Sequence, residues 1–176
     1  MPDGLLLVEG ESDRIAMRAL AARLEIDLAS AGVDVVAMGG VTNLGKHLET
    51  ARGVDVVAVL HDVGETSYVE RVIDRAPGHR PARFACDLDL EDELIRSLGT
   101  SRTIDVIEAA DDLTRWHTLT AQPFHRQRPE QLVLRRFLGT TSGRKARYAQ
   151  LLVDALDLAR APEPMAAALA TVTPGR

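Results

Sequence analysis

Three clusters of acidic residues in this chain each follow a short apolar run. In chain order the groups are Glu9-Gly-Glu-Ser-Asp13, Asp62-Val-Gly-Glu65 and Asp87-Leu-Asp-Leu-Glu91. Carboxylates that converge on one point repel each other unless a cation lies between them. Such hard oxygen donors suit Mg²⁺ or Mn²⁺, and Mg²⁺ usually keeps waters that leave room for a substrate phosphate. The acidic groups therefore predict a divalent-metal site, provided that the fold brings them together.

Some of these acids also have a purely structural interpretation. Glu11 and Asp13 would lie in the first turn of a helix, where the helix dipole favours negative charge, and Asp89 is a good N-cap. Glu9 is different, because it stands directly after the run LLLV and before Gly10, where capping does not explain it. A functional role is therefore better supported for Glu9 than for the other three.

Strands and helices alternate in the first part of the chain. Short runs rich in Val and Leu predict buried strands at residues 5–8, 33–38, 54–60 and 83–86. Segments with helical spacing at 14–28, 43–51, 68–75 and 90–98 follow them. This alternation predicts a doubly wound α/β fold with a mainly parallel four-stranded sheet and helices on both faces. Ligands gather at the carboxyl ends of such strands, where the acidic groups stand.

From residue 103 onward the sequence is mostly helical. Candidate helices lie near 103–110, 112–120, 129–138, 142–159 and 163–172. We predict an α/β core at residues 1–102, with residues 103–176 as a helical extension that packs on the core and completes the site.

The charges are divided unevenly along the chain. The net charge is −5, but residues 1–121 carry 12 Lys/Arg against 22 Asp/Glu, whereas residues 122–176 carry 9 against 4. An acidic front and a basic tail suit a metal site beside a phosphate-binding surface, although unevenly scattered surface charge gives the same count. The aromatic share of 3% weighs against a single-strand surface built from stacked aromatic side chains.

The cysteine and histidine content excludes two classes of site. The single cysteine, Cys86, excludes an internal disulfide framework and favours the reducing cytoplasm. The five histidines are scattered and match no zinc spacing. The first apolar run is too short for a signal peptide or a membrane span, so we predict a soluble cytoplasmic protein without a membrane partner.

A basic cluster follows Ser142, which is a good N-cap for the next predicted helix. Arg144, Lys145 and Arg147 fall in or next to its first turn, where positive charge opposes the helix dipole. A local rule broken without visible compensation points to function, and a helix N-terminus with basic residues beside it suits a phosphate. We predict that these three residues contact nucleic-acid phosphates. A tolerated surface cluster is the alternative.

Four stretches of the sequence resemble a known family. LLLVEGESD resembles the first motif of Toprim domains, and DVVAVLHD resembles the second, in which a strand ends in an Asp-x-Asp pair. DLEDELIRSLG and RRFLGTTSGRKARYAQLLVDAL are similar to segments of the Toprim region in overcoming-lysogenization-defect (OLD) family nucleases. They look closer still to small stand-alone bacterial proteins that contain only that region. The resemblance covers roughly residues 5–172.

This resemblance implies metal-dependent hydrolysis of phosphodiester bonds in DNA or RNA. Glu9 and Asp13 match the first-motif ligands, and Asp62 matches the leading acid of the second motif. Asp89 and Glu91 match the acids of the third group. Two Mg²⁺ or Mn²⁺ ions would clamp the attacking water and the leaving oxygen, with Glu9 also able to accept a proton.

The sequence departs from the family pattern at one position. Gly64 stands where the second acid of Asp-x-Asp is expected, and a longer Glu65 side chain one position on could reach back to the ion. One ion or two therefore stays open. Lys145 matches the active-site lysine of the family, which would neutralise transition-state charge.

Two other functions stay compatible with the sequence. One is a non-catalytic Toprim module that binds metal or nucleic acid and acts with a partner protein. The other is a phosphohydrolase that acts on a nucleotide-like small substrate, which would need fewer basic contacts than a duplex does. The partner protein and the oligomeric state, a homodimer included, stay open.

Overall fold

The computed structural model describes residues 2–76, 78, 80–139 and 143–173. The strands are β1 (Gly4–Val8), β2 (Val33–Ala37), β3 (Val56–Asp62) and β4 (Ala82–Cys86). The helices are α1 (Glu11–Arg23), α2 (Leu44–Thr50), α3 (Thr66–Arg75), α4 (Leu90–Leu98), α5 (Thr100–Ala109), α6 (Leu113–Thr120), α7 (Glu130–Gly139), α8 (Arg144–Ala155) and α9 (Glu163–Val172). Short 3₁₀ turns lie at Val41–Asn43, Val63–Glu65 and Leu158–Arg160.

The four strands form one sheet in the order β2-β1-β3-β4, and every pairing between them is parallel. The chain leaves β1 for β2 on one side and then returns to add β3 and β4 on the other. The winding direction therefore changes between β1 and β3, which pair with Leu7 opposite Val59. Ligands bind at such a change of direction, outside the carboxyl ends of the strands. The predicted doubly wound α/β sheet is confirmed.

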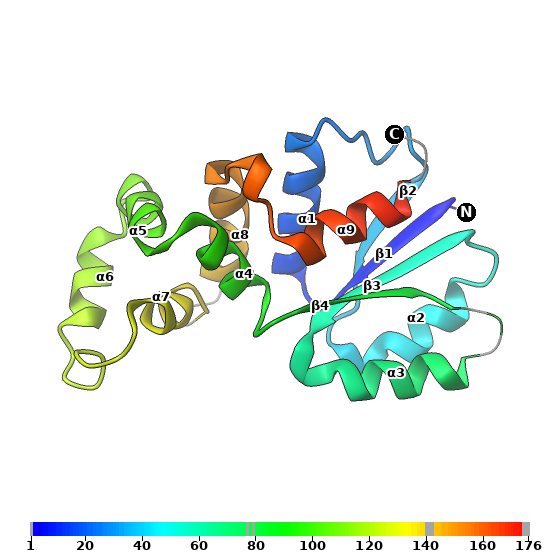
Figure 1. Cartoon of the computed structure of the whole chain (residues 1–176), viewed down its shortest axis with the longest axis horizontal. Coiled ribbons are helices and arrows are strands. Elements are labelled where there is room, and N and C mark those ends of the chain that lie inside the picture. The colour runs from blue at the N-terminus through cyan, green and yellow to red at the C-terminus, as the bar shows by residue number, and fades with distance from the viewer. Residues whose placement is uncertain (1, 77, 79, 140–142, 174–176) are drawn as a thin grey trace.

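Helices cover both faces of the sheet (Figure 1). Leu6 and Val8 of β1 face the core that includes buried residues of α1 and α9. Leu5 and Leu7, which point the other way, pack in the core formed with α2 and α3. Because β1 is buried on both faces, it appears in the sequence as a continuous apolar run rather than as an alternating one.

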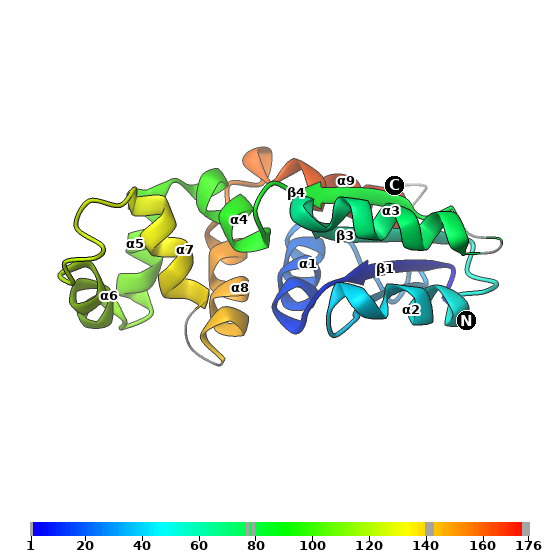
Figure 2. The ribbon, with the colours of Figure 1, turned by 90° about the horizontal axis from the view of Figure 1, so that it is seen from below.

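Helices α4 to α8 form a second group beyond the carboxyl ends of the strands (Figures 1 and 2). Helix α8 packs along α1, and α7 packs against both α4 and α8. In the interior of this helical group, the Phe137 ring packs edge to face against both Trp116 and Tyr148. The buried carboxylate of Asp112 accepts hydrogen bonds from the Tyr148 hydroxyl at 2.9 Å and from Arg147 at 3.1 Å.

Some predicted boundaries were wrong. Helix α1 ends at Arg23 rather than at residue 28, because Glu25 takes a positive φ of 59° that a right-handed helix does not allow. The predicted helix at 142–159 is α8 followed by a 3₁₀ turn. Every helix in the described part of the chain is too short or too polar to cross a membrane.

The proposed boundary at residue 102 lies inside α5. The last helix, α9, contacts β1, β3 and β4, so the C-terminal portion supplies part of the cover of the sheet. The division into a core and an extension stays a prediction.

Candidate metal centre

Glu9 and Asp13 are held by the turn that joins β1 to α1. The carbonyl oxygen of Glu9 accepts a hydrogen bond from the Gly40 N–H at 3.0 Å, which ties the end of β1 to the loop after β2. The Asp13 carboxylate accepts from the Gly10 N–H at 2.8 Å and thereby caps the first turn of α1. Burial raises the pKa of Asp13, even though this hydrogen bond opposes the shift. Asp13 therefore has the structural role that its position predicted, and its carboxylate lies among other acids.

Asp62 ends β3 and lies at the centre of the acidic residues. Burial is the main cause that raises its pKa to about 7, and the Glu9 carboxylate is the next. Asp89, Asp13 and Glu65 raise it further by the same repulsion. The carboxylates that follow β1, end β3 and precede α4 therefore repel one another at one edge of the sheet. The sequence predicted this convergence from the positions of the strand ends.

Glu65 lies at the end of the 3₁₀ turn that follows β3. Its Oε2 atom is buried and has no hydrogen-bond partner within the described residues. Burial, and then the carboxylate of Glu9, raises the pKa of Glu65. The side chain therefore reaches back toward Glu9, as expected if it compensates for the missing acid at position 64.

The third acidic group is partly neutralised by basic residues. Asp89 caps α4 by accepting from the Asp92 N–H at 2.8 Å, and its other oxygen accepts from Arg135 Nε at 2.6 Å. Glu91 is only 3% exposed, and its Oε2 lies 3.3 Å from Lys145 Nζ. Burial raises the pKa of Glu91 to about 7, against the opposing effect of Lys145. The Glu91 Oε1 atom is buried without a hydrogen-bond partner among the described residues.

Lys145 reaches the acidic residues from the first turn of α8. Burial acts to lower its pKa, but the carboxylates of Glu91, Asp13 and Asp89 outweigh this and raise it. Lys145 is thus a firmly charged ammonium beside several carboxylates. Gly143 is the N-cap of α8, and Ser142, the predicted cap, lies outside the described residues.

The structure does not bring the other two predicted phosphate contacts to this edge. Arg144 donates to the Phe137 carbonyl oxygen at 3.1 Å and lies over the Phe137 ring. Arg147 donates to Asp112 and, at 2.7 Å, to the Ala110 carbonyl oxygen. Both guanidinium groups therefore stabilise the packing of α8 on its neighbours. Their contact with nucleic acid stays a prediction.

Arg135 is the residue beside the acids that the sequence did not indicate. It lies on α7 at the start of the family-similar stretch RRFLGTTSGRKARYAQLLVDAL, but neither that resemblance nor a capping position indicated a contact with the acids. Its ion pair with Asp89 joins residues that are far apart in the chain. Only the packing of α7 against α4 could reveal this contact.

Carboxylate oxygens are suitable ligands for a hard divalent cation, but in this structure the acidic side chains do not surround a single position. Across residues 2–76, 78, 80–139 and 143–173, no three His, Cys, Asp or Glu side chains are gathered closely enough to hold an ion. One reason is that Asp89 and Glu91 turn oxygens toward Arg135 and Lys145. Within the described residues, Glu65 and Glu91 each have a buried carboxylate oxygen without a hydrogen-bond partner, and a cation is one group that could satisfy such oxygens.

The raised pKa of Asp62 predicts how stability depends on pH in the metal-free protein. Folded Asp62 keeps its proton up to about pH 7, whereas the unfolded chain releases it near pH 3.8, so the free energy of unfolding should fall as the pH rises through this window. Asp62→Asn cannot release a proton, so its free energy of unfolding at pH 8 should exceed that of wild type by about 2 kcal/mol. The pKa shift alone would predict a larger difference, but water screens the half-exposed side chain.

Urea unfolding in EDTA at pH 5 and pH 8 measures this effect. The control variant is Asp34→Asn, which removes an exposed carboxylate on β2 outside the acidic groups. Equal pH dependence in wild type and Asp62→Asn would contradict the crowding of carboxylates around Asp62.

Comparisons with known proteins identify similar sequences and folds. Residues 2–63 match the family model described as overcoming lysogenization defect protein-like, TOPRIM domain. The C-terminal region of the Burkholderia pseudomallei OLD protein superimposes with a TM-score of 0.69 at 23% identity, covering 98% of this chain and 97% of that one. For the C-terminal region of the Xanthomonas campestris pv. campestris OLD protein the values are 0.68, 23%, 98% and 95%. No curated protein matches the sequence.

The family match includes Glu9, Asp13 and Asp62 but ends before Gly64. The fold of the whole chain is that of the OLD C-terminal regions, and the resemblance predicted from the motifs is confirmed. At this level of identity the structural likeness establishes the fold and leaves the roles of Asp89, Glu91 and Lys145 as predictions.

Proposed function

For a chain with an OLD-like Toprim match at residues 2–63 and the fold of OLD C-terminal regions, we propose Mg²⁺- or Mn²⁺-dependent hydrolysis of phosphodiester bonds in DNA or RNA. The observation that carries the proposal is the convergence of carboxylates around Asp62 at the carboxyl edge of the sheet. Such crowding disfavours the metal-free ionised state, and a divalent cation would relieve it. Toprim domains generally bind divalent metals, which supports the same assignment.

The residues at this edge fall into two groups. Glu9, Asp62 and Glu65 would hold the cation directly, because Asp62 and Glu65 each have a pKa raised by the Glu9 carboxylate. Asp13, Asp89 and Glu91 would complete the site once their present hydrogen-bond and ion-pair partners release a carboxylate oxygen. The bound ion would polarise the phosphodiester and make a water more acidic. Glu9 at the open end of β1 would accept the proton of that water.

Lys145 would stabilise the charge that develops on the phosphate oxygens during bond cleavage. Its ammonium group lies 3.3 Å from Glu91 Oε2, and the lysine side chain is 45% exposed, so the side chain is anchored by an ion pair and still accessible to a ligand. A fixed cation aimed at developing negative charge contributes about 3 to 4 kcal/mol to lowering a barrier in sites of this kind. This role explains why a lysine occupies the first turn of α8 against the helix dipole.

The proposed activity is tested with supercoiled plasmid, single-stranded DNA and single-stranded RNA in Mg²⁺, Mn²⁺ or EDTA. Wild type should cleave at least one substrate in a divalent ion and none in EDTA. Cleavage that is unaffected by both Glu9→Gln and Lys145→Ala would identify a contaminating nuclease and overturn the proposal. Hydrolysis of a nucleotide without cleavage of a polymer would instead support the small-substrate alternative.

One observation favours the second candidate, a Toprim module that binds metal without cleaving nucleic acid. Position 64 holds a glycine where the family pattern has an acid, so the site offers one carboxylate fewer. A Cβ atom added at Gly64 would meet no atom within 4 Å, so the glycine is not required by packing. The two candidates therefore differ in whether the present carboxylates are enough for turnover.

Introducing Gly64→Asp is expected to tighten Mn²⁺ binding about tenfold, or about 1.4 kcal/mol, because it supplies the missing hard ligand without a steric clash. Isothermal titration with Mn²⁺ measures the change, and Ser101→Asp, an added charge at an exposed position on α5, is the control. A tighter site that still cleaves nothing would favour the binding module. Unchanged affinity would show that position 64 does not face the cation.

A further inference from the structure

A polynucleotide that approaches the acidic edge of the sheet needs more positive charge than Lys145 provides. The carboxylates around Asp62 repel a phosphate backbone, and a polyanion binds through several Lys or Arg contacts. Arg144 and Arg147 are engaged by Phe137, Asp112 and the Ala110 carbonyl oxygen. None of these partners belongs to the acidic edge, so further cations beside the acids have to come from another element.

Helix α7 and the segment before it provide such cations. A surface hollow of about 500 Å³ is lined by six residues. They are Asp89, Arg128, Leu132, Arg135, Arg136 and Gly139. Three arginines thus face one carboxylate, which reverses the local charge relative to the acidic edge. Asp89 lines this arginine hollow and is also one of the acids of the candidate metal centre, so the hollow lies directly beside that centre.

Two of these arginines are already oriented by their surroundings. Arg135 Nε donates to Asp89 at 2.6 Å, while the side chain stays 38% exposed. The Arg128 guanidinium lies 4.3 Å from the centre of the Phe124 ring. A guanidinium held in this way keeps N–H groups available for bidentate contact with a phosphate and loses little entropy on binding.

We propose that the arginine hollow binds the phosphodiester backbone of a polynucleotide next to the bond that the metal centre would cut. The identity of the polymer rests on the proposed function. The shared Asp89 links the two sites: the oxygen now paired with Arg135 becomes available to a cation when Arg135 turns to a phosphate. Substrate binding and completion of the metal centre would then support each other.

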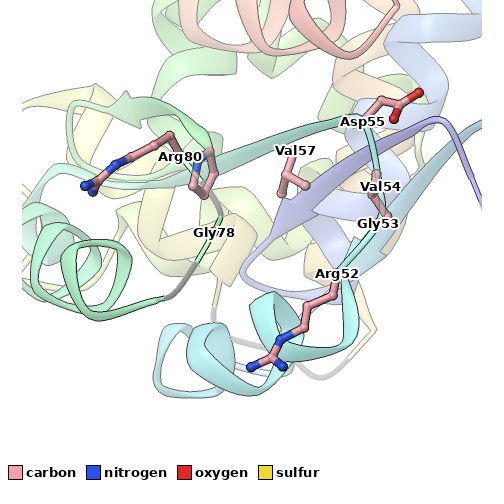
Figure 3. A pocket seen from close by; sticks show the side chains of 8 residues that line it. Arg52, Gly53, Val54, Asp55, Val57, Gly78 and Arg80 are labelled. Atoms are coloured by element: carbon pink, nitrogen blue, oxygen red, sulfur yellow. The ribbon is translucent and has the colours of Figure 1, made fainter.

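A second hollow at the opposite end of the sheet provides matched controls. It lies at the amino ends of β3 and β4 and includes Arg52 and Arg80 among its lining residues (Figure 3). The strand directions place it far from the carboxylates that follow β1 and β3. Arg52→Ala and Arg80→Ala therefore remove the same charge as Arg128→Ala and Arg135→Ala, but away from the proposed path.

The test is fluorescence anisotropy with labelled 20-nucleotide DNA and RNA, single-stranded and duplex, in Ca²⁺ across a series of KCl concentrations. Arg128→Ala and Arg135→Ala should each weaken binding and reduce the slope of log affinity against log salt by about 1, because each removes one phosphate contact. Arg52→Ala and Arg80→Ala should keep the wild-type slope. The four nucleic acids distinguish a single-strand path from a duplex path.

Equal slopes for wild type, Arg128→Ala and Arg135→Ala would overturn the inference, as would an equal loss in all four alanine variants. Arg135→Lys keeps the positive charge opposite Asp89 and controls for misfolding of Arg135→Ala. It should restore most of the wild-type slope of log affinity against log salt. Binding requires no turnover, so the two proposals fail separately. Arginine-dependent binding without cleavage would contradict only the proposed hydrolysis, and cleavage with arginine-independent binding would contradict only the arginine hollow.

Discussion

Replacing Glu9 with glutamine is expected to lower metal-dependent cleavage at least about a hundredfold while the fold stays intact. Glu9 follows β1 at the point where the sheet changes its winding direction, and its carboxylate raises the pKa of both Asp62 and Glu65. Glutamine keeps the shape but removes the charge that would attract the cation and accept a proton. Loss even of residues that only orient metal ligands costs 10- to 100-fold, so loss of a ligand sets a lower limit near the top of that range.

Initial rates of plasmid cleavage across a Mn²⁺ series measure this effect, with thermal unfolding as the check on folding. Glu49→Gln is the matched control, because Glu49 is exposed on α2 and lies outside the acidic groups. The metal-free Glu9→Gln protein should also be no less stable than wild type at pH 8, since it has lost a repelling charge. A cleavage rate within a few-fold of wild type would remove Glu9 from the site.

Lys145→Ala is expected to lower the cleavage rate at saturating metal by about a hundredfold to a thousandfold without weakening metal binding. The loss follows from removing a fixed cation next to the reacting phosphate. Metal affinity should stay the same or increase, because the ammonium no longer competes for Glu91. Lowered turnover with unweakened metal binding separates a charge stabiliser from a residue that only supports the ligands.

The separation of these two effects is measured by titrating Mn²⁺ into both proteins and comparing rates at saturation. The sequence contains one other lysine, Lys46, which is exposed on α2, and Lys46→Ala is the matched control. Lys145→Arg should recover part of the rate, since it restores the charge with a different shape. A Lys145→Ala protein with unchanged turnover would leave the ion pair with Glu91 as a purely structural contact.

The basic residues beside the acids explain how the metal-free chain tolerates so many carboxylates at one edge. Lys145 pairs with Glu91, and Arg135 pairs with Asp89, so protein cations partly substitute for a bound ion. Asp62 and Glu65 form no such ion pair among the described residues, and repulsion from neighbouring carboxylates helps to raise the pKa of each. The stability predicted for Asp62→Asn at high pH and the loss of function predicted at the same edge therefore have one physical origin.

The amino-acid sequence by itself determined the sheet and the position of the acidic edge. Strands buried on both faces must be short continuous apolar runs, which made β1 and β3 visible in the sequence. Residues that follow parallel strands must meet at one edge, so Glu9 and Asp62 could be placed together without a structure. The N-cap at Asp89 was equally visible, because capping depends on neighbours within one turn.

Only the tertiary structure decided which basic residues join that edge. Lys145, Arg144 and Arg147 share one basic cluster, and only the family resemblance singled out Lys145. In the structure Lys145 reaches Glu91, while Arg147 donates to the buried Asp112. No sequence pattern indicated the contact of Arg135 with Asp89, the N-cap of a different helix. Strand ends and caps follow from local backbone geometry, whereas the side of α7 and α8 that faces the sheet depends on packing between helices distant in sequence. No local spacing encodes that packing.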